Sequence, residues 1–253
     1  MKKSLDDIIN DAYQLFSCYS VKQPLDACTN CCITKEQESK LASLRVKDIP
    51  FQLLYDYNVA AKATNPDINE LKHFLPRILE LTSKFEFISH SIEVIFTQFD
   101  SFKPEQWTIE EKELIQSFGE SFFRKCLKLF PLPEMEQIDS ILIMLYKTGI
   151  DVQKLFDIWT KELNQTSLLH FNNLLWNCFK NPDSEILSNG FADDHLSTLI
   201  FTWSNQDYKL IQFQNEIESI IMDSGNLDEW TLNELNWTYD RLNKLKFERE
   251  NKK

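Results

Sequence analysis

Only 4 glycines occur among the 253 residues, and this scarcity constrains the fold more than any other feature of the sequence. Folds built from strands and tight turns use glycine in hairpins and bulges, and phosphate-binding loops need it where the backbone approaches a ligand. Apolar residues recur instead at intervals of three and four along nearly the whole chain, as in amphipathic helices. The sequence therefore predicts helices joined by short caps, and it lacks the glycine patterns of Walker and Rossmann sites.

Helix start and stop signals divide this pattern into about a dozen helices. Helices are expected over residues 87–99 and 134–148, and the second should end before Gly149. The long helix that lies between these two in the sequence should end at Pro131 and Pro133. Asn181-Pro182 and Gly225 are expected to break the pattern near its C-terminal end. The predicted N-caps are Ser4, Thr34 with Gln37, Asp48 with Pro50 in the first turn, Asp67 with Glu70, and Thr108.

These elements predict an all-α fold. Short connections favour antiparallel neighbours, arranged as an irregular helical-pair solenoid of the HEAT type or as an orthogonal multi-helix bundle. No strict repeat consensus of the ankyrin or tetratricopeptide kind is present. We expect a single domain over residues 1–253, with residues 131–133 as a soft internal boundary.

Charge is unevenly distributed along the chain. The whole chain carries a net charge of −12, and residues 129–240 alone carry five Lys or Arg against eighteen Asp or Glu. A basic footprint for nucleic acid is therefore missing, and the acidic segment favours a basic protein partner. An acidic surface that only keeps the protein soluble is the alternative interpretation.

The sequence predicts a cytoplasmic protein without a membrane segment. The longest apolar runs, such as residues 141–145, are far too short to span a bilayer, and residues 1–7 are charged instead of apolar. Six cysteines are scattered over a long chain, which favours reduced thiols over a disulfide scaffold.

A cysteine motif is the best candidate for chemistry. Cys28 and Cys31 are spaced so that both thiolates can reach one tetrahedral zinc ion, with Cys32 as a third ligand and His73 or His90 as a fourth. No second C-x-x-C pair or histidine pair accompanies the motif. A redox pair and plain reduced thiols remain as alternatives, although a redox pair normally starts a helix in a βαβ unit, which this chain lacks.

A second candidate site combines Asp67, His73 and Arg77 around Pro76. His73 and Arg77 are one helical turn apart, so both side chains could face a single binding pocket. In the alternative interpretation Asp67 caps the helix, Pro76 kinks it or separates two helices, and Arg77 pairs with an acid or a helix end. No motif of an established enzyme class is present, and we expect a non-enzymatic protein.

Several segments resemble a family of uncharacterised bacterial proteins over residues 24–130. They are Cys28-Thr29-Asn30-Cys31-Cys32, a helix ending near Arg45, Leu53-Leu54-Tyr55-Asp56-Tyr57 with Ala60-Ala61, His73-Phe74-Leu75-Pro76-Arg77-Ile78-Leu79-Glu80-Leu81, and Trp107 before an acidic helix start. The resemblance implies a bacterial, cytosolic, helical protein, and it transfers no catalytic residue to this chain.

The six tryptophans mostly follow helical spacing, which predicts packing between helices. Any tryptophan that proves to be exposed would mark a binding face. The sequence thus leaves two hypotheses, an acidic interaction module for a basic protein and a zinc-binding protein.

Overall fold

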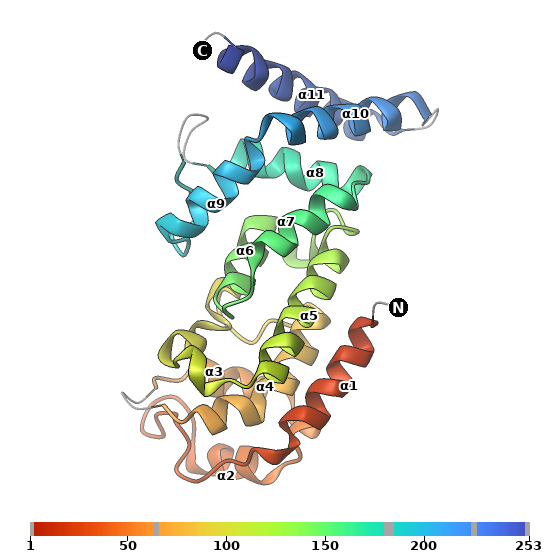
Figure 1. Ribbon diagram of the computed structural model, residues 1–253. Helices are drawn as coiled ribbons and strands as arrows, with labels where there is room; N and C mark the ends of the chain where they lie inside the picture. The colour runs from red at the N-terminus through yellow and green to blue at the C-terminus, as the bar shows by residue number, and fades with distance from the viewer. Residues whose placement is uncertain (1–2, 63–65, 180–184, 224–226, 251–253) are drawn as a thin grey trace. The chain divides into compact units, whose positions relative to one another are not determined.

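The computed structural model describes residues 3–62, 66–179, 185–223 and 227–250 (Figure 1). Its described residues form helices and turns and contain no strand, apart from an isolated bridge between Phe179 and Leu187. This confirms the predicted all-α, multi-helix fold. The α-helices are α1 (Leu5–Leu15), α2 (Lys35–Ser43), α3 (Phe51–Val59), α4 (Ile68–Ser83), α5 (Ile109–Cys126), α6 (Ile138–Tyr146), α7 (Val152–Lys161), α8 (Gln165–Asn173), α9 (Asp194–Ser204), α10 (Asp207–Asp223) and α11 (Glu229–Glu250).

Short helical turns accompany these helices. The 3-10 turns are η1 (Phe16–Cys18), η2 (Val46–Asp48), η3 (Ile92–Val94), η4 (Thr97–Ser101), η5 (Pro104–Gln106) and η6 (Pro133–Met135), and η7 (Leu174–Cys178) is a turn of π-helix. The breaks expected at Asn181-Pro182 and Gly225 lie outside the described residues.

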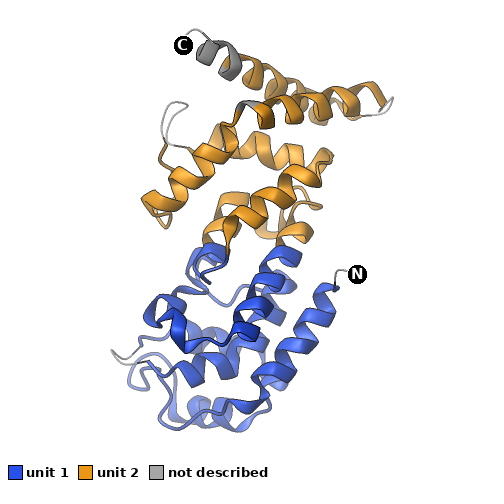
Figure 2. Ribbon diagram, in the orientation of Figure 1, with its two compact units in different colours: residues 1–122, 144–150 blue, residues 123–143, 151–253 orange. Residues whose placement is uncertain are grey.

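Two compact units make up the chain (Figure 2). Unit 1 contains Met1–Phe122 and Met144–Ile150, and unit 2 contains Phe123–Ile143 and Asp151–Lys253, so that α5 and α6 each contribute to both units. The division falls inside α5, and residues 131–133 lie within unit 2. The single domain expected over residues 1–253 stays a prediction.

Side-chain caps start several helices where the sequence predicts them. Ser4 and Asp7 form a reciprocal capping box on α1, as Thr34 and Gln37 do on α2. At α5 the Thr108 hydroxyl accepts a hydrogen bond from the Glu111 backbone N–H. These side chains satisfy backbone donors that a helix start leaves unpaired.

Two predicted helical features of unit 1 are wrong. Asp48 does not cap α3, because it ends η2 and pairs with Arg45, and Pro50 is the N-cap residue, one position before the first turn. Residues 87–99 form no α-helix but contain the turns η3 and η4. This segment is rich in β-branched, aromatic and serine residues, which are weak helix formers, and its packing into the core overrides the apolar spacing.

Helix α4 belongs to both sites predicted from the sequence, because His73 is a member of each. It is a single helix of 16 residues that includes Pro76, so the two-helix alternative is wrong. It packs against α1, and its apolar face, including Phe74 and Leu75, is fully buried. All of the predicted residues Asp67, His73 and Arg77 lie on α4 or at its N-cap.

Unit 2 has an aromatic core. Trp203 stacks on Phe156 with ring centroids 4.8 Å apart, and Trp159 and Phe171 contact the same indole. Helix α11 packs against both α10 and α8, and α10 and α11 lie side by side in Figure 1. The π-turn η7 directly follows α8, the helix that packs against α11.

The helix boundaries of residues 127–149 differ from the prediction. Helix α5 already ends at Cys126, before Pro131, and α6 starts at Ile138 because η6 occupies residues 133–135. Gly149 follows the end of α6 with a φ of 76°, the left-handed conformation that glycine adopts without strain.

Candidate functional site

The three cysteines of the predicted zinc motif lie together in unit 1. The Sγ atoms of Cys28 and Cys31 are 3.2 Å apart, those of Cys31 and Cys32 are 3.4 Å apart, and all three lie within 4.8 Å of one another. The loop is closed by backbone hydrogen bonds from Cys32 and Ile33 to the Cys28 carbonyl, and the Cys28 N–H donates to Ala61. Backbone geometry therefore holds three soft ligands in reach of one ion.

Hydrogen bonding within the cluster gives Cys28 and Cys31 different pKa values. A hydrogen bond from Cys31 lowers the pKa of Cys28, and the hydrogen bonds with Cys28 and Cys32 raise the pKa of Cys31 to about 12. Cys28 thus ionises before Cys31, and the thiolate is the form that binds metals and reacts as a nucleophile.

His73 is not part of the cysteine cluster. Its Nδ1–H donates to the Tyr19 carbonyl at 2.9 Å, and its ring packs edge-on against Phe74 at 4.9 Å. Its Nε2 atom is buried without a hydrogen-bond partner. The structure brings together Cys28, Cys31 and Cys32 and leaves His73 elsewhere on α4.

The second predicted set is engaged in contacts within unit 1. Asp67 caps α4 by accepting a hydrogen bond from the Asn69 N–H at 2.9 Å. Arg77 donates from Nε to the Ile49 carbonyl at 3.0 Å and from Nη1 to Glu80 at 2.7 Å. Each side chain contacts a different part of the unit, and these contacts give Asp67 a capping role and Arg77 a packing role.

Two further polar clusters of unit 1 have no clear sequence signal. Glu70 does not complete a capping box with Asp67, because its carboxylate accepts from the Tyr57 hydroxyl at 2.6 Å and from the Asp26 N–H at 2.8 Å. Nearby, Lys62 Nζ donates to the Tyr57 carbonyl at 2.8 Å, and burial lowers the pKa of Lys62 to about 8.

The other cluster is a buried ion pair. Lys72 Nζ lies 2.8 Å from a carboxylate oxygen of Glu111, and their side chains are only 4% and 2% exposed. Tyr19 donates to the same carboxylate, and the Gln106 carbonyl accepts from Lys72. Its members come from segments far apart in the chain, so sequence spacing could not have paired them.

Comparisons with protein-family models, with curated proteins and with solved structures find no match to this chain. Function therefore has to be inferred from the described residues. Among the helices that the structure describes, none combines the length and the apolar character that a membrane span requires.

The tryptophans divide into two groups. Trp107, Trp159 and Trp203 are buried, as the packing interpretation predicts, whereas Trp176, Trp230 and Trp237 are exposed. All three exposed tryptophans belong to unit 2. Because an exposed tryptophan is expected to mark a binding face, these three residues are the candidates for one.

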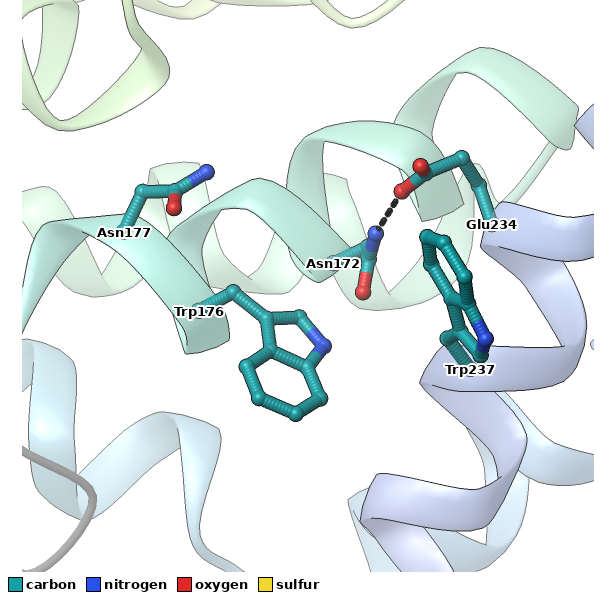
Figure 3. Close-up of a pocket in the computed structure, with 5 residues that line it drawn as sticks. All are labelled: Asn172, Trp176, Asn177, Glu234 and Trp237. Atoms are coloured by element: carbon teal, nitrogen blue, oxygen red, sulfur yellow. Dashed lines mark hydrogen bonds between the residues drawn. The ribbon is translucent and has the colours of Figure 1, made fainter. Parts of the chain in front are cut away.

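Two of these tryptophans line a pocket in unit 2 (Figure 3). It has a volume of about 430 Å³, within the range of small-molecule sites. Trp237 and Glu234 lie three residues apart on one face of α11, and the other walls come from α8 and η7. The lining residues are Asn172, Trp176, Asn177, Glu234 and Trp237.

The sequence did not single out this pocket, because α8 and α11 are separated by more than fifty residues. The available signal was the polar residues three and four positions before two tryptophans. These are Asn172 and Asn173 before Trp176, and Asn233 and Glu234 before Trp237, where a buried indole would have apolar neighbours at this helical spacing.

Proposed function

We propose that this chain is a non-enzymatic helical interaction module whose unit 2 binds a basic protein partner. The observation that carries the proposal is the charge exposed by the acidic segment. Among the described residues of 129–240, eleven carboxylates are exposed against two lysines, Lys154 and Lys161. The exposed carboxylates belong to Glu134, Asp151, Asp157, Glu185, Asp193, Asp194, Glu218, Asp223, Asp228, Glu229 and Asp240.

Exposed apolar side chains support the same assignment. Of the eleven large hydrophobic side chains that are exposed in the described part of the chain, ten belong to unit 2, and Ile109 belongs to unit 1. Aromatic and methionine side chains are enriched at protein interfaces, and exposed tryptophans are the commonest hot spots. Exposed carboxylates and exposed aromatic rings in the same unit suit a partner with basic and apolar side chains.

The experiment is capture of partners by the immobilised full chain from a lysate of the source organism, with elution by rising salt and identification by mass spectrometry. We expect basic proteins that elute as salt increases, because salt screens the attraction between exposed charges. A captured protein is then purified, and its dissociation constant is measured at two ionic strengths.

Paired neutralisations locate the surface. Glu229→Gln with Asp240→Asn removes two exposed charges from α11, and Glu105→Gln with Glu113→Gln removes two from unit 1. The first pair should weaken binding by roughly threefold to tenfold, because exposed ion pairs contribute modestly, and the second pair should leave it unchanged. Binding that is insensitive to salt, or equally sensitive to both pairs, contradicts the proposal.

A second candidate function is binding of one zinc ion by Cys28, Cys31 and Cys32. The three clustered sulfur atoms favour it, since zinc prefers thiolate ligands in a tetrahedral arrangement. Three sulfur ligands leave the fourth position for a water molecule or a ligand from outside the cluster. His73 is not needed for this version of the site, because its Nδ1 is already bonded to the Tyr19 carbonyl.

Elemental analysis of protein purified without a metal-affinity step tests this candidate. We expect about one zinc per chain, lost in Cys28→Ser and retained in Cys18→Ser, whose thiol is exposed but lies outside the cluster. Absence of metal together with reactive thiols at Cys28, Cys31 and Cys32 in the folded protein would refute it.

A further inference from the structure

We propose that the pocket between α8, η7 and α11 receives a cationic side chain of the partner, and that arginine is its preferred occupant (Figure 3). This inference rests on the proposed function, because it names the group on the basic partner that unit 2 recognises. Three features of the pocket carry it: an unpaired acceptor, two indole rings and a carboxylate.

Asn172 supplies the unpaired acceptor. Its side-chain nitrogen Nδ2 donates to the Glu234 carboxylate. An ionised carboxylate can only accept, so the amide orientation is determined, and Oδ1 is the atom left over. The residue is 5% exposed, and Oδ1 is buried with no hydrogen-bond partner. Burial of an acceptor without a donor is unfavourable, and nearly all such atoms in folded proteins have a partner.

The unpaired oxygen points into the pocket. Figure 3 shows the Asn172 side chain between the two indoles, with Oδ1 directed into the space between them. Trp176 and Trp237, the indoles on either side of this oxygen, are 51% and 57% exposed, so both rings lie at the surface of unit 2. A donor that enters between the rings would complete the hydrogen bonding of Asn172.

The indole rings favour a cation. The face of a tryptophan ring attracts a guanidinium or ammonium group within about 6 Å of its centre. Trp176 already makes this interaction inside the protein, because the Arg241 guanidinium lies 5.0 Å from its ring centre. Arg241 does not line the pocket, which leaves the lining indole surface of Trp176 and the Trp237 ring to an incoming group.

The charge of the lining also favours a cation, and its geometry favours arginine. Glu234 is the only titratable residue among the five that line the pocket. A guanidinium carries five donors in a plane, so one group can stack on an indole and donate to both Asn172 Oδ1 and Glu234. An ammonium group has three donors and no plane to stack, so lysine should bind more weakly.

The test uses the full-length protein and a small probe. N-acetyl-arginine amide is titrated into ¹⁵N-labelled protein while the indole N–H signals of Trp176 and Trp237 are followed by NMR. We expect saturable shifts of these two signals, and N-acetyl-citrulline amide, which has the same shape without charge, should bind at least about tenfold more weakly. N-acetyl-lysine amide should rank between the two.

Variants assign the binding to the pocket. Trp237→Ala should abolish the shifts, and Trp237→Phe should retain part of the affinity because it retains an aromatic face. Glu234→Gln keeps an acceptor for Asn172 and removes the charge, so it should weaken the arginine probe by about tenfold and the citrulline probe hardly at all. Asn236→Ala, an exposed neighbour on α11 outside the pocket, should change nothing.

Equal binding of the arginine and citrulline probes would overturn the cationic assignment, and shifts that survive Trp237→Ala would overturn the assignment to this pocket. The two proposals can fail separately. If a basic protein binds in the salt-dependent manner described above but the arginine probe does not, the interaction module stands and the pocket fails. If the probe binds but no basic protein is captured, the pocket stands as a cation site and the proposed function fails.

Discussion

The buried ion pair of unit 1 allows a quantitative test of how the fold is held together. Lys72 and Glu111 lie 2.8 Å apart with side chains 4% and 2% exposed, so neither charge can be solvated by water. Lys72→Met keeps an unbranched side chain that is one atom shorter than lysine, and it removes the charge. It leaves the Glu111 carboxylate buried with two neutral donors, the Tyr19 hydroxyl and the Thr108 N–H.

The expected cost follows from this inventory. Removal of one member of a buried pair typically costs about 3–5 kcal/mol, because an uncompensated charge remains. The two neutral donors that remain on Glu111 place Lys72→Met near the lower end, at about 3 kcal/mol, and the Gln106 carbonyl also loses its partner. For a chain of this size that loss corresponds to a decrease in Tm of roughly 6–12 °C.

A second variant separates charge burial from packing. Glu111→Gln added to Lys72→Met removes the orphaned charge and keeps hydrogen-bonding groups for Tyr19 and Thr108. Replacement of a buried pair by neutral residues is often nearly neutral, so the double variant should recover about 2 kcal/mol relative to Lys72→Met.

Urea unfolding followed by ¹⁹F NMR of 5-fluorotryptophan-labelled protein measures these differences locally. Trp107 is the only tryptophan of unit 1, and Lys72 Nζ lies 5.0 Å from its ring centre. Its signal, assigned by its loss in Trp107→Phe, reports the stability of the region around the pair. A loss below about 1 kcal/mol in Lys72→Met, or a double variant less stable than Lys72→Met, would refute the reasoning.

Three further predictions concern single sites. Burial lowers the pKa of His170, so protonation favours the unfolded state and stability should fall below pH 6.5. His170→Gln, which keeps a donor for the Leu129 carbonyl, should flatten the urea-unfolding profile between pH 5 and 6.5, and an unchanged slope would contradict this assignment. The pKa of Lys62 is about 8 against an ordinary 10.5, so the unfolding free energy should rise as the pH increases from 8 to 10.5. An equal rise in Lys62→Met would exclude Lys62 as its source. Gly119→Ala would bring a Cβ to 2.7 Å from Ile150 Cδ1, an atom that Ile150→Val removes. The double variant should therefore lose about 1–2 kcal/mol less in thermal unfolding than the sum of the two single variants. Simple additivity would argue against the clash.

Local signals in the sequence were sufficient for helix starts and for the cysteine cluster. Ser4 and Thr34 cap their helices through residues three positions away, so the structure is contained in four consecutive residues. Cys28, Cys31 and Cys32 are close for the same reason, because one turn of backbone brings their sulfur atoms together.

Apolar spacing was not sufficient to predict secondary structure where tertiary packing competes with helix propensity. Residues 87–99 contain Ile88, Ile92 and Ile95 at helical intervals, yet the segment forms 3-10 turns. The spacing only records which side chains are buried, and an irregular segment with short turns buries them as effectively as one helix does.

Sites built from segments far apart in the chain could not be predicted from the sequence. His73 was expected near the cysteines, but the Tyr19 carbonyl and the Phe74 ring orient its imidazole instead. The tryptophan pocket requires α8 and α11 to pack against each other, and neither helix carries a signal for its partner.

An unpaired buried atom does not by itself mark a site, and comparison of His73 with Asn172 shows why. His73 Nε2 lacks a partner, but the ring of His73 is fixed by the Tyr19 carbonyl and packs against the buried Phe74. Asn172 Oδ1 lies in a pocket lined by two half-exposed indoles. This oxygen is directed into a pocket that can admit a donor, whereas the His73 ring is held by the Tyr19 carbonyl and the Phe74 ring, and for that reason we assign a ligand to unit 2 and none to His73.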